Sequence, residues 1–333
     1  MEYAGGELSQ MFAQKRNLLR PRFWSMLRDI LRFYRSAPAL LSADPDLSLG
    51  AWLDANGYGR PFVEDHILPM GAAIWSASVE GMRAFPVRHF ARFFSNHGLL
   101  QLSGRPAWRT VAGGSRQYVS RMTAQLSDLR LGTAVSRVSR HDLGVSLSLA
   151  DGRTERFDQV ILACHADQAL AMLDQPTEAE RAVLGAVRCQ DNRAVLHTDA
   201  QAMPRRRAVW SAWNYLSDSQ ADHGQTVSVT YWMNRLQSLE TARPLFVSLN
   251  PLQEPDPASV LLTRSYRHPQ FDAAAMQAQA RLPDIQGTGG VYFAGAWTGW
   301  GFHEDGIASA VRVAGLLGIT PPWATSATSR LAA

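Results

Sequence analysis

The sequence predicts an α/β protein with more than one hydrophobic core, and three observations support this. The chain has 333 residues, 46% of them hydrophobic, which is enough for two packed domains. Residues 8–97 carry the apolar spacing of helices, whereas residues 134–157 alternate in polarity like antiparallel strands. Residues 160–163 are continuously apolar, which is typical of a parallel strand buried on both faces.

The helical region is expected to consist of several short helices. Its pattern is interrupted by turn-forming and helix-breaking residues at Pro38, Asp44-Pro45, Asn56-Gly57 and Pro69. Residues 108–115 then predict a strand followed by the glycine pair Gly113-Gly114, and a helix should follow through Tyr118, Met122 and Leu126.

A β-meander comes next. Four short strands are expected at 129–131, 134–139, 145–149 and 153–157, the later ones joined by Gly144 and Gly152 turns. After the apolar run at 160–163 the chain predicts a helix and a second sheet, with strands at 194–197, 208–213, 227–232 and 245–249. Aromatic residues on these strands are expected to form sheet core, and a common pocket is the alternative.

The end of the chain predicts a strand, a glycine-rich turn and a helix. Residues 291–293 are apolar, and Gly295, Gly299, Gly301 and Gly306 allow the backbone that follows to approach a ligand closely. A helix should start at Asp305, with its apolar face formed by Ile307, Ala310, Val311 and Ala314. Its N-terminus would favour an anionic group by about 0.3–1 kcal/mol. Residues 319–333 are rich in Ser, Thr and Ala and predict a disordered tail.

These residues also carry a family resemblance. The segment 293–306 resembles the C-terminal flavin motif of the flavin amine oxidase superfamily, in its bacterial branch of predicted NAD/FAD-binding oxidoreductases, and the similarity runs from Tyr3 to Ala314. The resemblance implies a glutathione-reductase-like FAD-binding domain, with a parallel sheet and a β-meander, and a mixed helix/sheet substrate domain. It assigns the substrate domain to 1–107 and 166–268, and the FAD-binding domain to 108–165 and 269–318.

The same resemblance implies site residues and a cofactor, FAD. Candidate cofactor-binding residues, in chain order, are Gly113, Gly114, Val135, Gly295, Ala296, Trp297, Asp305, Gly306 and Ile307. His303 and Glu304 directly precede the expected helix start and are candidates for proton exchange with substrate or flavin. For both, helix capping is the alternative role.

The sequence departs from the family pattern in three ways. It contains no Gly-x-Gly-x-x-Gly turn of the kind on which the pyrophosphate of FAD sits, so we expect an incomplete FAD-binding domain. Met1 is then interpreted as an internal start, so that the segment with this turn is either cut off or supplied by a separate polypeptide. FAD binding by this chain alone should be weak. Many amine oxidases of the superfamily place a lysine, through a water, against flavin N5, where it assists reoxidation by oxygen. Here Lys15 is the sole lysine and lies far from the flavin motif. Ala296 replaces the carboxylate with which many relatives bind the ribityl chain.

The leading functional prediction is an FAD-dependent oxidoreductase that transfers a hydride from an apolar substrate to flavin, of dehydrogenase or desaturase type. A flavin amine oxidase is the alternative within enzymes, and a non-catalytic remnant or partner subunit is the alternative outside them. The substrate is expected to be a small molecule, in one interpretation lipid-like.

Charge and cysteine content limit the partners and the compartment. Residues 1–35 hold seven basic and three acidic side chains, which accounts for the whole net charge of +4. With large apolar neighbours, residues 8–35 predict either an ordinary surface helix or a peripheral membrane contact, broken near Pro21, and not a nucleic-acid site. Cys164 and Cys189 lie far apart in the chain without a ligand motif, so we expect no metal site and a cytoplasmic location.

Overall fold

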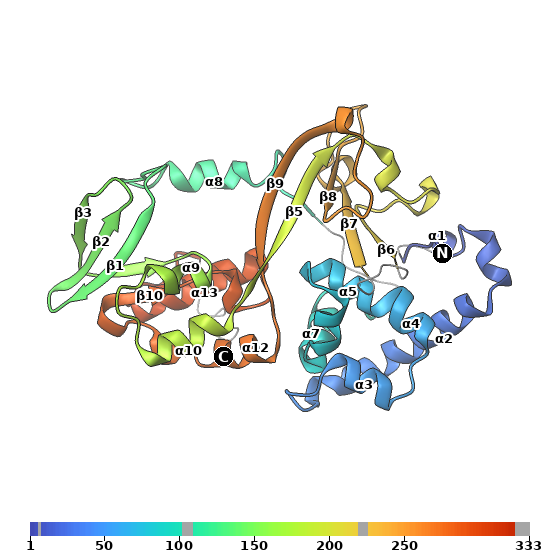
Figure 1. The fold of residues 1–333 in the computed structure, drawn as a ribbon, viewed down its shortest axis with the longest axis horizontal. Coiled ribbons are helices and arrows are strands. Elements are labelled where there is room, and N and C mark those ends of the chain that lie inside the picture. Colours follow the sequence, from blue (N-terminus) through green and yellow to red (C-terminus); the bar gives the residue numbers. More distant parts are fainter. Residues whose placement is uncertain (6–7, 102–108, 219–225, 324–333) are drawn as a thin grey trace. The chain divides into compact units, whose positions relative to one another are not determined.

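The computed structural model describes residues 1–5, 8–101, 109–218 and 226–323. The chain divides into two compact units: Met1–Ser127 with Asp191–His268, and Asp128–Gln190 with Pro269–Ala333. We call them unit 1 and unit 2 and describe each by itself (Figure 1). The domain boundaries expected from the sequence stay a prediction. Residue 108, where the strand expected before Gly113-Gly114 begins, and most of the expected tail lie outside the described residues. Residues 109–112 form no strand, so this expectation was wrong there.

Unit 1 begins with a group of short helices, as the breaks in the pattern predict (Figure 1). The described helices before residue 97 are α1 (Leu8–Met11), η1 (Lys15–Leu19), α2 (Pro21–Ser36), η2 (Ala37–Ser42), α3 (Leu49–Ala55), α4 (Arg60–Phe62), η3 (Val63–Ile67), α5 (Leu68–Trp75), α6 (Val79–Ala84) and α7 (Val87–Asn96). Their apolar faces meet around fully buried phenylalanines, among them Phe23, Phe33, Phe62, Phe90 and Phe94. Aromatic side chains supply much buried area per residue, which suits a core made of short helices.

Pro69 does not break its helix, because the preceding turn widens. Residues 63–67 form a π-helix that continues into α5, with Pro69 in the first turn of α5. Proline has no backbone N–H, so the carbonyl of Asp65 loses its usual partner four residues ahead. The hydroxyls of Tyr3 and Tyr215 donate to this carbonyl, at 2.9 and 3.2 Å. Burial raises the pKa of Tyr3 and raises that of Tyr215 to about 12, so both remain donors.

An antiparallel sheet completes unit 1. Its described strands are β5 (Cys189–His197), β6 (Trp213–Asp218), β7 (Thr226–Trp232), β8 (Phe246–Leu249) and β9 (Val260–Pro269), in the order β6-β7-β8-β5-β9. The short helices η4 (Ala200–Ala202), η5 (Arg207–Val209), α11 (Met233–Leu236) and η6 (Pro257–Ser259) connect them. The strand predicted at 208–213 is replaced by η5, and β6 and β9 were not predicted. Most sheet aromatics pack in the cores on its two faces.

Three polar side chains form a buried row across this sheet. The ring Nδ1 of His197 accepts the backbone N–H of Asp199 at 3.2 Å, so Nε2 carries the proton and donates to Ser248 Oγ at 2.9 Å. Ser248 in turn shares a hydrogen bond of 2.7 Å with Thr230. Burial lowers the pKa of His197, which keeps the ring neutral. In this tautomer His197 cannot act as a general base toward Ser248, and the row is structural.

Unit 2 contains the predicted meander and a parallel strand pair. The meander comprises β1 (Val135–His141), β2 (Gly144–Leu149) and β3 (Thr154–Phe157), paired antiparallel in that order. Strand β4 (Val160–Leu162) pairs in parallel with β10 (Val291–Phe293), as the apolar runs predict. The expected strand at 129–131 does not form. Figure 1 shows α9 (Ala166–Met172), α10 (Glu178–Ala186), α12 (Ala273–Ala280) and α13 (His303–Leu316) around the strand pair.

A buried ion pair ties the meander to the helices. Arg140 on β1 is paired with Glu180 of α10, a fully buried residue, and donates to the carbonyl of Thr288 at 3.0 Å. Glu180 also closes a capping box, because its carboxylate accepts the backbone N–H of Thr177 at 2.8 Å. The pair therefore holds three segments of unit 2 together: β1, the start of α10 and the turn η8 (Thr288–Gly290) that leads into β10.

Candidate functional site

The turn between β10 and α13 is held by a short chain of hydrogen bonds. The backbone N–H of Gly295 donates to Ser309 Oγ at 2.9 Å, and that hydroxyl donates to the carbonyl of Gly306 at 2.6 Å. Thr298, in η9 (Ala296–Thr298), donates from Oγ1 to the carbonyl of Gly295 at 2.9 Å. Gly295 has a φ of 147°, which side chains rarely allow. The glycine at this position lets the chain turn sharply and return along α13.

From the other side, α12 fixes the outer part of the same turn. Gln279 Nε2 donates to the carbonyls of Trp297 and Gly299, at 2.8 and 2.7 Å. The side chain of Trp297 is buried in the core of unit 2, and its indole N–H donates to the carbonyl of Cys164 at 3.1 Å. Its indole is thus a packing element that joins the turn to the end of β4. Any contact of Trp297 with a cofactor would have to come from its backbone.

The helix after the turn begins earlier than the sequence predicts. Helix α13 starts at His303 and not at Asp305, which lies in its first turn. The carboxylate of Asp305 folds back and accepts the backbone N–H of Phe302 at 2.9 Å. A side chain on Gly299 would collide with this carboxylate, which is why glycine suits that position. The first amides of α13 have no acceptor within the helix, as at every helix start, and together they present a partial positive charge.

The apolar stripe of α13 is on its surface. The sequence pattern places Ile307 and Ala310 on the apolar face, but both are exposed, Ile307 by 45%, and the buried side chains are Ser309 and Val313. On β4, Ile161 is 47% exposed. A Cβ added at Gly306 would meet no atom within 4 Å, so the first turn of α13 is open on that side. Unit 2 by itself therefore leaves an uncovered apolar surface next to the start of this helix.

Most of the predicted site residues lie in unit 2, and the glycine pair lies in unit 1. Ala296 and Gly295 lie in the turn, and His303 and Glu304 are exposed in the first turn of α13. Val135 starts β1 and packs against the core of unit 2. The glycine pair Gly113-Gly114 belongs to unit 1, where it precedes α8 (Arg116–Thr123), a helix without buried residues. The pair has positive φ at both positions, as a tight turn requires.

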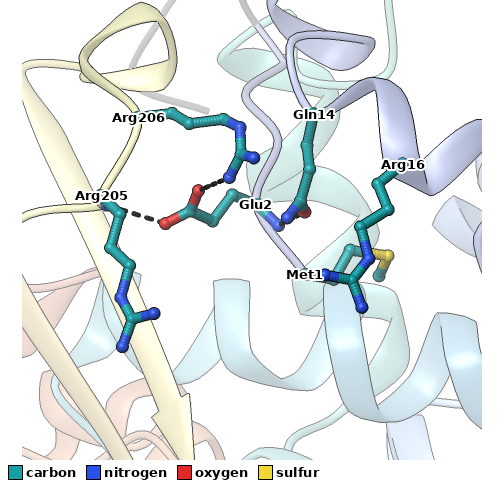
Figure 2. A pocket seen from close by; sticks show the side chains of 6 residues that line it. All are labelled: Met1, Glu2, Gln14, Arg16, Arg205 and Arg206. Carbon is teal, nitrogen blue, oxygen red and sulfur yellow. Dashed lines mark hydrogen bonds and ion pairs between the residues drawn. The ribbon is translucent and has the colours of Figure 1, made fainter.

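Two cavities lie in unit 1 and contain none of the predicted site residues. One, of about 660 Å³, is lined by Met1, Glu2, Gln14, Arg16, Arg205 and Arg206. Figure 2 shows the carboxylate of Glu2 between two of these residues: it accepts from the backbone N–H of Arg205 at 2.7 Å and from Arg206 Nη1 at 2.8 Å. The other cavity, of about 360 Å³, lies beside the polar residues Ser228 and Thr230 of the sheet.

A further cluster was missed by the sequence reasoning. His165, Asp167 and Cys189 bring one potential ligand atom each to within 4.8 Å of one another in unit 2. His165 and Asp167 stand close together in the sequence, but Cys189 reaches them only through the fold, so spacing alone gave no signal. Separately, none of the helices in the described ranges combines the length and apolar character needed to cross a bilayer.

Comparisons with known proteins identify the family of the whole chain. The model of the family described as flavin containing amine oxidoreductase matches residues 6–317. Similar solved structures include a CLA-producing fatty acid isomerase from P. acnes (TM-score 0.62, 12% identity, 90% of this chain and 76% of that chain). They also include a putrescine oxidase double mutant (TM-score 0.62, 13% identity, 90% of this chain and 76% of that chain). A third is a reduced UDP-galactopyranose mutase (TM-score 0.55, 10% identity, 91% of this chain and 74% of that chain). No curated protein sequence matches. The chain belongs to the flavin containing amine oxidoreductase family, and its cofactor is FAD.

Proposed function

We propose that this protein is an FAD-dependent oxidoreductase that removes a hydride from an apolar substrate, in a dehydrogenase or desaturase reaction. The observation that carries the proposal is the open first turn of α13. It combines helix amides that have no acceptor within the helix with a glycine, Gly306, whose Cβ position is free space. It is bordered by the exposed Ile307 and by the hydrogen-bonded, part-buried turn. When bound, FAD supplies the hydride acceptor.

The residues of unit 2 fit the flavin end of this cofactor. Backbone amides at a helix start favour a group that gains negative charge, and exposed apolar side chains favour a flat, largely apolar ring. Gly295 and Gly306 would leave room for the ring, because neither has a side chain. The backbone of Ala296 and the first amides of α13 would face the ring, with Ile307 against it. The buried Trp297 and the two carbonyl contacts of Gln279 keep the turn in place. These residues position the site and need not react.

The pyrophosphate end has no matching residues in this sequence. We propose that a separate segment with a strand, a Gly-x-Gly-x-x-Gly turn and a helix supplies it and covers the exposed apolar surface of β4 and α13. Among the described residues, β4 pairs only with β10, and its Ile161 is half exposed. Each charge-assisted contact to the pyrophosphate contributes about 1.5–3 kcal/mol, so FAD binding by this chain alone should be weak.

We propose that His303 or Glu304 exchanges a proton at this site. Both are exposed in the first turn of α13, on the open side of unit 2. The test is anaerobic flavin reduction by substrate in the protein with its dinucleotide-binding segment supplied. A His303→Gln or Glu304→Gln variant that slows reduction about 100-fold or more identifies the base, with Glu178→Gln on another helix as the control. Unchanged reduction in both variants would remove proton exchange at this position.

The lysine content of the chain bears on reoxidation of the flavin, and it favours a dehydrogenase or desaturase over an amine oxidase. Its sole lysine, Lys15, is exposed in η1 of unit 1, so no lysine is available in unit 2 to assist reoxidation. The similar structures include both a fatty acid isomerase and a putrescine oxidase, so the fold alone does not choose. Anaerobic bleaching of bound flavin by apolar compounds, but not by amines, is the expected result. Bleaching with peroxide formation from amines would identify an amine oxidase, and no bleaching by either class would indicate a remnant.

Residues 8–35 provide a second candidate activity, contact with a membrane surface. Leu19 is 86% exposed and Trp24 is 49% exposed, and the neighbouring Lys15 and Arg16 are exposed cations. Such a pairing of apolar and basic side chains favours the interface of an anionic bilayer. Cosedimentation with liposomes containing phosphatidylserine should fall strongly for Leu19→Glu. Equal cosedimentation of this variant, or no dependence on anionic lipid, would sink the idea.

A further inference from the structure

Unit 2 contains one cluster of side chains that the flavin chemistry does not use. His165 directly precedes α9, Asp167 lies in the first turn of that helix, and Cys189 begins β5. One potential ligand atom from each lies within 4.8 Å of the other two. The Cys189 thiol donates to Asp167 Oδ1 across 3.9 Å, and all three residues are half-buried. An imidazole, a carboxylate and a thiol therefore converge on one point.

A second observation at the same place concerns the ring of His165. The ring Nδ1 of His165 is buried and has no hydrogen-bond partner among the residues that the structure describes. The backbone of His165 is held separately, because its N–H donates to Gln168 Oε1 at 3.3 Å. Buried nitrogen atoms of this kind nearly always have a partner, so an unsatisfied one requires an explanation. A bound ion beside the ring would explain it.

We propose that His165, Asp167 and Cys189 form a binding site for a zinc-class transition metal ion, with the fourth position open to water. Ligand atoms of a tetrahedral zinc ion stand about 3.4–3.7 Å apart, given bonds of about 2.0–2.3 Å. The observed separations, up to 4.8 Å, reach this range through small rotations of the side chains. Mg²⁺ and Ca²⁺ prefer oxygen ligands, so the thiol and imidazole favour Zn²⁺ or Co²⁺.

Binding at this site would act on the flavin turn. Cys164, the residue before His165, accepts the indole N–H of Trp297 through its carbonyl, and Trp297 lies in η9. Only one peptide unit therefore separates a metal ligand from a contact that holds the turn. On binding, the Cys189 S–H bond breaks, its proton goes to solvent, and a sulfur–metal bond forms, so affinity should rise with pH. The proposal does not rest on the proposed oxidoreductase activity.

The test is titration of the full chain, freed of any histidine tag, with CoCl₂, followed by absorption spectroscopy and displacement with ZnCl₂. The expected result is one Co²⁺ per chain, with a thiolate-to-Co²⁺ charge-transfer band in the near ultraviolet. Cys189→Ser should abolish the band, and His165→Gln should weaken binding about tenfold or more. Cys164→Ser is the matched control, because its thiol is next to the site but outside the cluster, and it should keep band and affinity.

The cobalt titration can overturn the proposal in two ways. Absence of the charge-transfer band in the wild-type chain overturns the proposal, and so does a band that Cys164→Ser abolishes and Cys189→Ser keeps. Thermal melting of each variant without metal shows whether it folds. Where a variant does not fold, the proposal is tested on the wild-type chain by its spectrum and by proton release in weakly buffered solution. One proton released per Co²⁺ bound supports thiolate ligation by Cys189, and none contradicts it.

Discussion

A side chain at Gly306 should block FAD without harming the fold. Gly306 lies in α13 with helical backbone angles, and a Cβ there would meet no atom within 4 Å. Gly315, near the other end of the same helix, has the same two properties and serves as the matched control. If the flavin occupies the space beside the first turn, Gly306→Leu will fill the space that the ring needs, and Gly315→Leu will not.

The structure allows the two effects to be given magnitudes. Replacing a helical glycine with alanine stabilises a helix by about 0.5–1 kcal/mol, so both Gly306→Ala and Gly315→Ala should raise the free energy of unfolding by that amount without FAD. Inserting extra carbon atoms into an occupied site costs about 1–3 kcal/mol. For Gly306→Leu this corresponds to a dissociation constant raised roughly 5- to 150-fold. Gly315→Leu should leave that constant unchanged.

The assays are urea unfolding of each variant and titration with FAD in the presence of the supplied dinucleotide-binding segment, monitored by flavin fluorescence. If Gly306→Leu binds FAD as tightly as Gly315→Leu, the flavin does not lie against the first turn of α13. If Gly306→Ala destabilises the chain strongly while Gly315→Ala does not, the open space described beside Gly306 is filled by the protein itself.

Three further predictions concern the two units. Glu180→Ala leaves Arg140 without its buried partner and should lower the free energy of unfolding by about 3–5 kcal/mol in urea titrations, whereas the exposed Glu178→Ala should change it little; a small effect of both would contradict the structural role of the pair. The folded-state pKa of His197 lies below its unfolded value of about 6.5. The contribution of His197 to the free energy of unfolding is therefore complete above pH 6.5, and it is lost as the pH falls below 6.5. The free energy of unfolding, measured from pH 5 to 8, should fall towards low pH, and His197→Gln should make it less dependent on pH. Tyr215→Phe removes one donor to the Asp65 carbonyl and should cost about 1 kcal/mol, a value that an unchanged unfolding midpoint would disprove.

The sequence predicted best those elements whose pattern is local. The apolar runs at 160–163 and 291–293 became a parallel pair, and the meander strands formed close to their expected bounds, because polarity along the chain reports which faces are covered. Strand β9 escaped prediction because it is exposed over most of its length and shows no apolar alternation. The expected strand at 208–213 was wrong, since the buried pair Val209 and Trp210 belongs to a turn.

The site was predictable in part. The glycine turn and α13 were read from residues adjacent in sequence, but the helix start was two residues late because Asp305 acts from inside the first turn. An apolar stripe shows that a helix face needs covering, and it does not show what covers it, so the exposure of Ile307 could not be foreseen. Cys189 joins His165 only through tertiary structure, which sequence spacing does not encode.

The most direct test of the central claim is a flavin titration of this chain, first alone and then with a polypeptide that carries a strand, a Gly-x-Gly-x-x-Gly turn and a helix. We expect weak or absent FAD binding by the chain alone, and one FAD bound per chain when the segment is present. Stoichiometric flavin in the purified chain alone would contradict the need for a supplied pyrophosphate turn. No flavin binding in either case would contradict the flavin site at the start of α13.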